Sequence, residues 1–127
     1  MNRQVLDENM RRETYEALSC RMSFDKVGVG FGQSGWSDER IRSELHGSGK
    51  TFHTLDEGYY RPDNCHATYC LVYYDVPRGE VADYIWRFLR HPAFNTHAKR
   101  LGKVVKVTSQ RIEYWEVGRE GKEEVTW

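Results

Sequence analysis

The sequence lacks a long apolar run, and its first residues lack the pattern typical of a secretion signal. None of its 127 residues belongs to an apolar stretch near the ~20 residues that a membrane span needs. The first residues, MNRQVLDENMRRETYE, lack the basic-then-apolar order of a signal peptide. We therefore expect a protein without a membrane partner that stays in the cytoplasm.

The chain also lacks net charge. Lys and Arg number 19 and Asp and Glu number 19, so no field of the whole molecule draws it to nucleic acid or membrane. The charge is nevertheless uneven, because residues 97–111 contain basic side chains and no acid, whereas acids follow from Glu113 onward. Any site for an anion is therefore expected to be local.

Cysteine is scarce, and the three that occur are Cys20, Cys65 and Cys70. No C-x-x-C pair is present, and the histidines near Cys65 and Cys70 do not have the spacing of a zinc finger or ribbon. We expect free thiols in a reducing compartment, no metal and no cofactor.

Apolar periodicity predicts one domain, residues 1–127, of the α+β class. Helical spacing over residues 3–18 predicts an N-terminal helix within residues 1–20. A second helix over about 79–101 is expected to kink or break at Pro92. Ser37 predicts the cap of a short helix that ends at Gly47. The remaining segments predict a mostly antiparallel sheet of about four to five strands.

Two segments near the C-terminus have their own expectations. Residues 103–117 fit either one long bent strand or a hairpin around Ser109-Gln110. Residues 118–127 are typical of a charged, mobile tail. The segment HATYCLVYYDV before them is apolar on both faces, which favours the middle of the sheet.

The stretch HGSGKT, residues 46–51, ends like a phosphate-binding loop. Such a loop needs a first glycine where this chain has Glu44, and it stands between a strand and the N-terminus of a helix. Here the glycines follow a predicted helix, at the electronegative end of its dipole. We therefore interpret HGSGKT as a helix end and a turn, and infer no ATPase or kinase.

A second glycine cluster, GFGQSG, places Gly30, Gly32 and Gly35 in the G-x-G-x-x-G spacing of dinucleotide-binding loops. Glu39 stands where that fingerprint needs an apolar residue. Glycines inside a strand each cost roughly 0.5–1 kcal/mol relative to alanine, so we expect something to lie close to the bare backbone. Two occupants stay open: Trp36 or a tyrosine of the chain itself, and a ligand or partner.

Two histidine-x-hydroxyl triplets, His46-Gly47-Ser48 and His66-Ala67-Thr68, each resemble the motif of the two-histidine phosphoesterases. In that family the motifs lie on paired strands much farther apart in sequence, so no residue roles are carried over. The resemblance leaves a small hydrolase or phosphodiesterase that uses His66 as one hypothesis.

An aromatic and basic surface is the remaining indication of binding. The loop GYYRPDN presents Tyr60 beside Arg61, and the basic run includes Lys99 and Arg100. Rings and guanidinium groups together suit a planar anion, through stacking and charge. The alternative is that the tyrosines cover the edge of the core and the lysines form a solvated face.

These features lead to one main hypothesis and a second of a different class. The first is a non-enzymatic binding module for a phosphate-bearing small ligand or nucleotide, with a site made of Gly30, Gly32, Gly35, Tyr60, Arg61, Lys99 and Arg100. The second is a protein-interaction or inhibitor module that forms a homo-oligomer, because four tryptophans and eight tyrosines suit interface hot spots. No catalytic residue is assigned, and whether the protein is an enzyme stays open.

Overall fold

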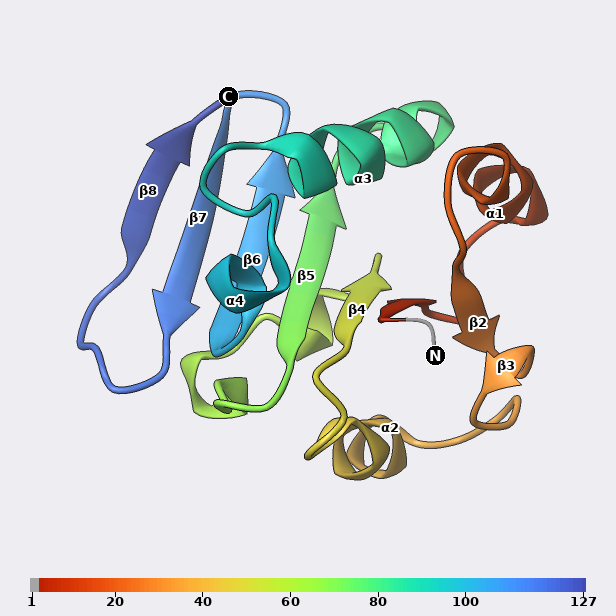
Figure 1. Cartoon of the computed structure of the whole chain (residues 1–127), viewed down its shortest axis with the longest axis horizontal. Coiled ribbons are helices and arrows are strands. Elements are labelled where there is room, and N and C mark those ends of the chain that lie inside the picture. The colour runs from red at the N-terminus through yellow and green to blue at the C-terminus, as the bar shows by residue number, and fades with distance from the viewer. Residues whose placement is uncertain (1–2) are drawn as a thin grey trace.

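The computed structural model describes residues 3–127 and arranges them around one eight-stranded sheet (Figure 1). The strands are β1 Gln4–Leu6, β2 Asp25–Val27, β3 Gly30–Phe31, β4 Thr51–Thr54, β5 Cys70–Asp75, β6 Lys103–Thr108, β7 Arg111–Glu116 and β8 Glu123–Thr126. The helices are α1 Arg12–Ser19, α2 Asp38–Leu45, α3 Val81–Arg90 and α4 His97–Arg100. Single helical turns form η1 Glu57–Tyr59, η2 Pro62–Asn64 and η3 Arg78–Glu80. Within residues 3–127, no helix is long and apolar enough to cross a membrane.

Most strands of the sheet are parallel. The order across it is β3-β2-β1-β4-β5-β6-β7-β8, and every pair from β3 to β6 is parallel, whereas β7 and β8 add antiparallel pairs. The prediction of a mostly antiparallel sheet of four to five strands was therefore wrong, while the α+β class was confirmed. The strands pair in parallel because helical connections return the chain to the edge of the sheet at which the previous strand began. Such connections are α1, between β1 and β2, and α3 with α4, between β5 and β6.

Both faces of the parallel strands are covered. On one face, α1 and α3 pack on a core that includes Leu6 and Phe88. On the other face, α2 and the turn η1 pack on a core that includes Val5 and Phe52. Neighbouring residues of β1 therefore serve opposite cores, as is typical of parallel strands that are buried on both sides.

The N-terminal segment begins with a strand where a helix was expected over residues 3–18. β1 pairs in parallel with β2 on one side and with β4 on the other, and α1 begins only at Arg12. Val5 and Leu6 are fully buried. Three residues are too few to display the period of a strand, and the charged residues beside them imitate a helical stripe.

Pro92 separates two helices within residues 79–101, so of the kink or break expected there the structure has the break. α3 ends at Arg90, and His91 is extended with ψ 134°. α4 begins after Thr96, whose side chain accepts a hydrogen bond from the Lys99 backbone N–H at 3.2 Å. Because the residue before a proline is pushed out of the helical region, the helix breaks at this point.

The C-terminal segments form an antiparallel extension of the sheet. β6 and β7 pair as a hairpin around Ser109-Gln110, which decides between the two alternatives for residues 103–117. Residues 118–127, expected as a mobile tail, contain β8, which pairs with β7. The Nε1–H of Trp127 donates a 2.7 Å hydrogen bond to the Thr108 carbonyl oxygen and so holds the end of this strand.

Three buried polar side chains, Gln4, His53 and Tyr74, form a hydrogen-bonded chain in the core beneath α3. Nε2 of His53 lies 2.8 Å from Gln4 Oε1, and Nδ1 lies 2.7 Å from the Tyr74 hydroxyl. Because an amide oxygen only accepts, Nε2 carries the proton and Tyr74 donates to Nδ1. Burial, with a smaller contribution from the charge of Arg100, lowers the pKa of His53 to about 3. The imidazole is therefore neutral in the folded protein at neutral pH.

We predict that His53 makes the protein less stable in acid. In the unfolded chain the His53 pKa returns to about 6.5, so below this pH unfolding takes up a proton that the folded state binds only near pH 3. The unfolding free energy should fall by roughly 1.4 kcal/mol per pH unit between these limits. Urea unfolding of the wild type and of His53→Gln at a series of pH values measures this contribution. Equal pH slopes for the two proteins would contradict it.

Candidate functional site

The order of the strands reverses between β1 and β4. From β1 the chain moves to β2 on one side, whereas β4, β5 and β6 follow one another on the other side. The connection after β1 leads to α1 on one face of the sheet, and the connection after β4 leads to η1 on the other. The two segments therefore diverge beyond the carboxyl ends of β1 and β4. Such a point of reversal is where open sheets of parallel strands bind ligands.

Three aspartates from three segments lie at this carboxyl edge, and we call Asp7, Asp38 and Asp56 the acidic triad. Asp7 directly follows β1, Asp56 follows β4, and Asp38 begins α2. Asp7 is buried, and its Oδ2 accepts a 2.6 Å hydrogen bond from the Thr54 hydroxyl. Asp38 Oδ1 accepts a 2.9 Å hydrogen bond from the Tyr59 hydroxyl. Asp56 Oδ1 accepts a 2.8 Å hydrogen bond from a backbone N–H of η1.

Burial dominates the electrostatics of Asp7, the buried member of the acidic triad. Burial raises the pKa of Asp7, the hydrogen bond from Thr54 opposes the rise, and the charges of Asp38 and Asp56 add to it. Burial also raises the pKa of the Tyr59 hydroxyl, and its hydrogen bond to Asp38 is the second-largest cause of the rise. Tyr59 therefore remains a donor at neutral pH. The negative charge of the triad costs stability, and a bound cation would relieve that cost.

An opening on the α2 side of the sheet is lined by one member of the acidic triad, Asp38. It has a volume of about 310 Å³ and is lined by Asp38, Glu39, Arg42, Gly58 and Arg61, among others. In the part of the chain that the structure describes, neither Arg42 nor Arg61 forms an ion pair. Two guanidinium groups are therefore available beside Asp38.

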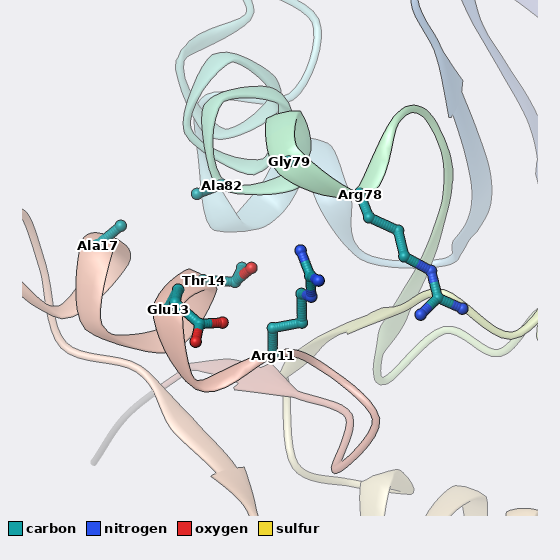
Figure 2. A pocket seen from close by; sticks show the side chains of 7 residues that line it. All are labelled: Arg11, Glu13, Thr14, Ala17, Arg78, Gly79 and Ala82. Carbon is teal, nitrogen blue, oxygen red and sulfur yellow. The ribbon is translucent and has the colours of Figure 1, made fainter.

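A second cavity, of about 330 Å³, lies on the α1 side of the same edge (Figure 2). Arg11, from the segment after β1, extends towards the start of α3. Arg78, from the segment after β5, extends away from the cavity. Thr14 and Ala82 line the space between the two helices. Arginines are thus present on both faces of the sheet at its carboxyl edge.

The triad is not a ready-made metal cage. No group of three or more His, Cys, Asp or Glu side chains in residues 3–127 is arranged to hold a metal ion by itself. Mg²⁺ does not require such a cage, because it binds through one or two carboxylates, keeps several waters and takes further ligands from the phosphates of a substrate. Asp38 and Asp56 each use one carboxylate oxygen in the hydrogen bonds described above, and the other oxygen suits this mode of binding.

The glycine cluster is filled largely by side chains of the protein. A Cβ on Gly30 would lie 2.5 Å from Oδ1 of Asp25, and a Cβ on Gly32 would lie 2.7 Å from the Trp36 ring. Trp36, one of the occupants considered for the bare backbone, therefore lies against Gly32. Gly35 faces open space, and its N–H donates a 3.1 Å hydrogen bond to a carboxylate oxygen of Glu8. Of the three glycines, Gly35 is the one bonded to the segment that carries Asp7.

Tyr60 and Arg61, which were predicted to bind a ligand together, point to different surroundings. Arg61 is exposed and lines the opening beside Asp38. The ring of Tyr60 instead packs against Trp115, with ring centroids 4.4 Å apart. Its hydroxyl is buried without a hydrogen-bond partner among the described residues. Tyr60 therefore covers the edge of the core, as in the alternative considered from the sequence.

Lys99 and Arg100 precede β6 and so lie at the amino edge of the parallel sheet, opposite the acidic triad. Nζ of Lys99 donates a 2.7 Å hydrogen bond to the Pro92 carbonyl oxygen. Arg100 is buried and donates a 2.9 Å hydrogen bond to the Phe94 carbonyl oxygen. The residues predicted from the sequence therefore do not gather into one site: Gly32, Gly35 and Arg61 lie towards the carboxyl edge, whereas Lys99 and Arg100 lie at the amino edge.

His66 also lies away from the triad, in the segment that enters β5. Its Nδ1 is 2.7 Å from the Thr68 hydroxyl, and its ring stacks on His46 with centroids 4.2 Å apart. All three cysteines are free, and burial raises the pKa of Cys70 to about 12. Cys70 is therefore a thiol of the core and a poor nucleophile.

Sequence reasoning missed the acidic triad, although a signal for two of its members is present. The triplet Leu-Asp-Glu occurs at residues 6–8 and again at residues 55–57. Both copies stand at the ends of strands, and these strands are neighbours in the sheet. The repeat gains meaning only when that pairing is known.

Comparison of the chain with known protein families, curated proteins and solved structures found no match. Its function must therefore be inferred from the geometry of the carboxyl edge.

We predict that Asp7→Asn stabilises the protein in the absence of divalent cations. Asparagine keeps an oxygen for the Thr54 hydroxyl and removes a buried charge. Because the pKa of Asp7 is raised in the folded state, its ionisation costs stability only as the pH rises above about 4. Thermal unfolding in EDTA should show similar stability near pH ~3 and a more stable variant at neutral pH. A variant that melts below the wild type at neutral pH would contradict this.

Proposed function

We propose that the protein is a divalent-cation-dependent phosphodiesterase with the acidic triad at its centre. The observation that carries the proposal is that Asp7, Asp38 and Asp56 come from three separate segments to the carboxyl edge where the strand order reverses, and that Asp38 also lines an opening there. The phosphate-bearing ligand expected from the sequence is retained. We now place the ligand site at the carboxyl edge instead of at the glycine cluster, and we propose that the protein cleaves the ligand as well as binds it.

The chemistry of the triad favours a hard cation. Carboxylates are the ligands that Mg²⁺ and Mn²⁺ prefer. Without a cation, the three carboxylates of the triad would repel a phosphate, because both are negatively charged. A cation between them reverses that repulsion. Histidine and cysteine, which would favour zinc, are absent from the residues that line the opening in the described chain.

Each carboxylate is held by a different part of the fold. Thr54 and burial fix Asp7, whereas Tyr59 orients Asp38. The turn η1 positions Asp56 through a backbone N–H. These contacts leave the carboxylates little rotational freedom, so less entropy is lost when a cation and its substrate bind.

The arginines at the opening suit the substrate. Guanidinium groups bind phosphate with two parallel hydrogen bonds, and Arg42 and Arg61 lie beside Asp38 without an acidic partner among the described residues. They would hold the phosphodiester and offset the charge that develops on its oxygens.

Hydrolysis places a hydroxyl group from water on phosphorus, breaks one P–O bond and returns a proton to the departing oxygen. When bound, the cation would polarise a phosphoryl oxygen and lower the pKa of a coordinated water. The triad orients that water and the substrate. A phosphodiesterase was one of the hypotheses from the sequence, with His66 as its catalytic residue. Because His66 does not line the opening, we assign the reaction to the carboxylates instead.

We predict cation-dependent cleavage of a phosphodiester. The full chain is incubated with labelled single-stranded RNA or with bis(p-nitrophenyl) phosphate, in Mg²⁺, Mn²⁺ or EDTA. Cleavage should require a cation. Asp38→Asn and Asp56→Asn should each reduce kcat/KM by more than about a hundredfold, since even groups that only support metal ligands are worth roughly 10- to 100-fold.

The matched control is Asp83→Asn, which neutralises an exposed aspartate on α3 outside the opening. It should leave cleavage unchanged. Cleavage that persists in EDTA, or that survives both Asp38→Asn and Asp56→Asn, would overturn the proposed function.

A further inference from the structure

A groove runs between α1 and α3, on the face of the sheet opposite α2. The two helices pack on the same core. Small side chains, Ala17 of α1 and Ala82 of α3, line the cavity of about 330 Å³ between them, together with Thr14, one carboxylate (Glu13) and two arginines (Arg11 and Arg78) (Figure 2). Because alanine fills little space, the helices leave an open path that starts at the carboxyl edge.

The far end of α3 carries a cluster of two indoles and three guanidinium groups, which we call the indole–guanidinium surface: Arg21, Trp86, Arg87, Arg90 and Trp127. Arg21 and Arg90 lie over the Trp86 ring, at 5.1 and 5.5 Å from its centroid. Arg87 lies over the Trp127 ring at 4.5 Å. A hollow of about 320 Å³ is lined by Trp86, Arg87, Arg90 and Trp127.

The groove and the indole–guanidinium surface share one stripe of α3. Ala82, Trp86 and Arg90 are spaced four residues apart, so they lie above one another on one side of the helix. Ala82 lines the first cavity and Trp86 and Arg90 line the second. The two hollows therefore lie one after the other along the same side of α3.

The guanidinium groups of this surface have unused hydrogen-bond donors. The side chains of Arg21, Arg87 and Arg90 are exposed and form no ion pair or hydrogen bond with another described residue. Stacking on an indole uses the face of a guanidinium and leaves the N–H groups at its edge free. Three such groups on one surface, in a chain with no net charge, are a local site for anions.

We propose that the α1–α3 groove and the indole–guanidinium surface bind a single-stranded nucleic acid. Its phosphates would contact the edges of the guanidinium groups, and its bases would stack on indole rings or guanidinium planes. The rings are the reason to choose a nucleic acid over an acidic protein segment, which would use the charges alone. This proposal does not require the cation site, because it concerns binding only, but it supplies a substrate class for the proposed phosphodiesterase.

The test is fluorescence anisotropy with the full chain and a labelled single-stranded oligouridylate of about 12 nucleotides, within the usual site size of such surfaces. EDTA is present throughout. Trp86→Ala should raise the Kd by about tenfold, as expected for loss of one stacked base. Arg87→Gln and Arg90→Gln should each weaken binding several-fold and reduce the dependence of the Kd on salt.

The matched control is Arg40→Gln. Arg40 also lies over an indole, at 4.5 Å from the Trp36 centroid, but on α2 and outside the groove. It should leave the Kd unchanged. Since Trp86 is partly buried, the two surface arginine variants keep the test decisive if Trp86→Ala fails to fold.

Asp7→Asn separates this proposal from the proposed function. It should abolish cleavage and leave binding in EDTA intact. Equal displacement of the oligonucleotide by polyglutamate at matched charge would overturn the proposal in favour of an acidic protein partner. Binding that is unchanged in Arg87→Gln and Arg90→Gln would overturn it as well.

Discussion

The position of β1 in the middle of the sheet is the constraint on which the rest of the molecule depends. Its residues Val5 and Leu6 are fully buried in opposite cores, between β2 on one side and β4 on the other. Since every later strand from β4 to β6 is added on one side only, β1 is where the strand order reverses. The connections after β1 and β4 therefore leave towards opposite faces, and the opening lies on one of these faces, between α2 and the segment of η1 and η2.

The same position explains why a charge is buried at the site. Asp7 is the first residue beyond β1, so it is enclosed by the elements that cover the strand. Its charge is unfavourable there, as the raised pKa indicates, and the hydrogen bond from Thr54 offsets only part of this cost. A stability cost at one site is common where a protein has to bind a ligand. We interpret Asp7 as a residue kept for function at the expense of stability.

Helices α1 and α3 connect the proposed centre with the proposed binding surface. Both start at the carboxyl edge, since each follows a parallel strand, and both pack on one face of the sheet. A strand of nucleic acid along their groove would meet Arg11 near the edge and the indole–guanidinium surface farther along α3. On the opposite face of the sheet, Arg42 and Arg61 line the opening beside Asp38. The arrangement is suited to a polymer that passes across the edge of the sheet.

The sequence by itself determined the elements whose signals are local: the cap of α2 at Ser37, the amphipathic α3, the break at Pro92 and the α+β class. Only the tertiary structure decided the parallel pairing, the strand at Gln4–Leu6, the packing of Trp36 on Gly32 and the approach of Asp7, Asp38 and Asp56 to one edge of the sheet. Of the site itself, Gly35 and Arg61 were predicted, because each belongs to a conspicuous loop. The triad was not, since the periodicity of a chain reports which residues are buried and not which distant segments become neighbours.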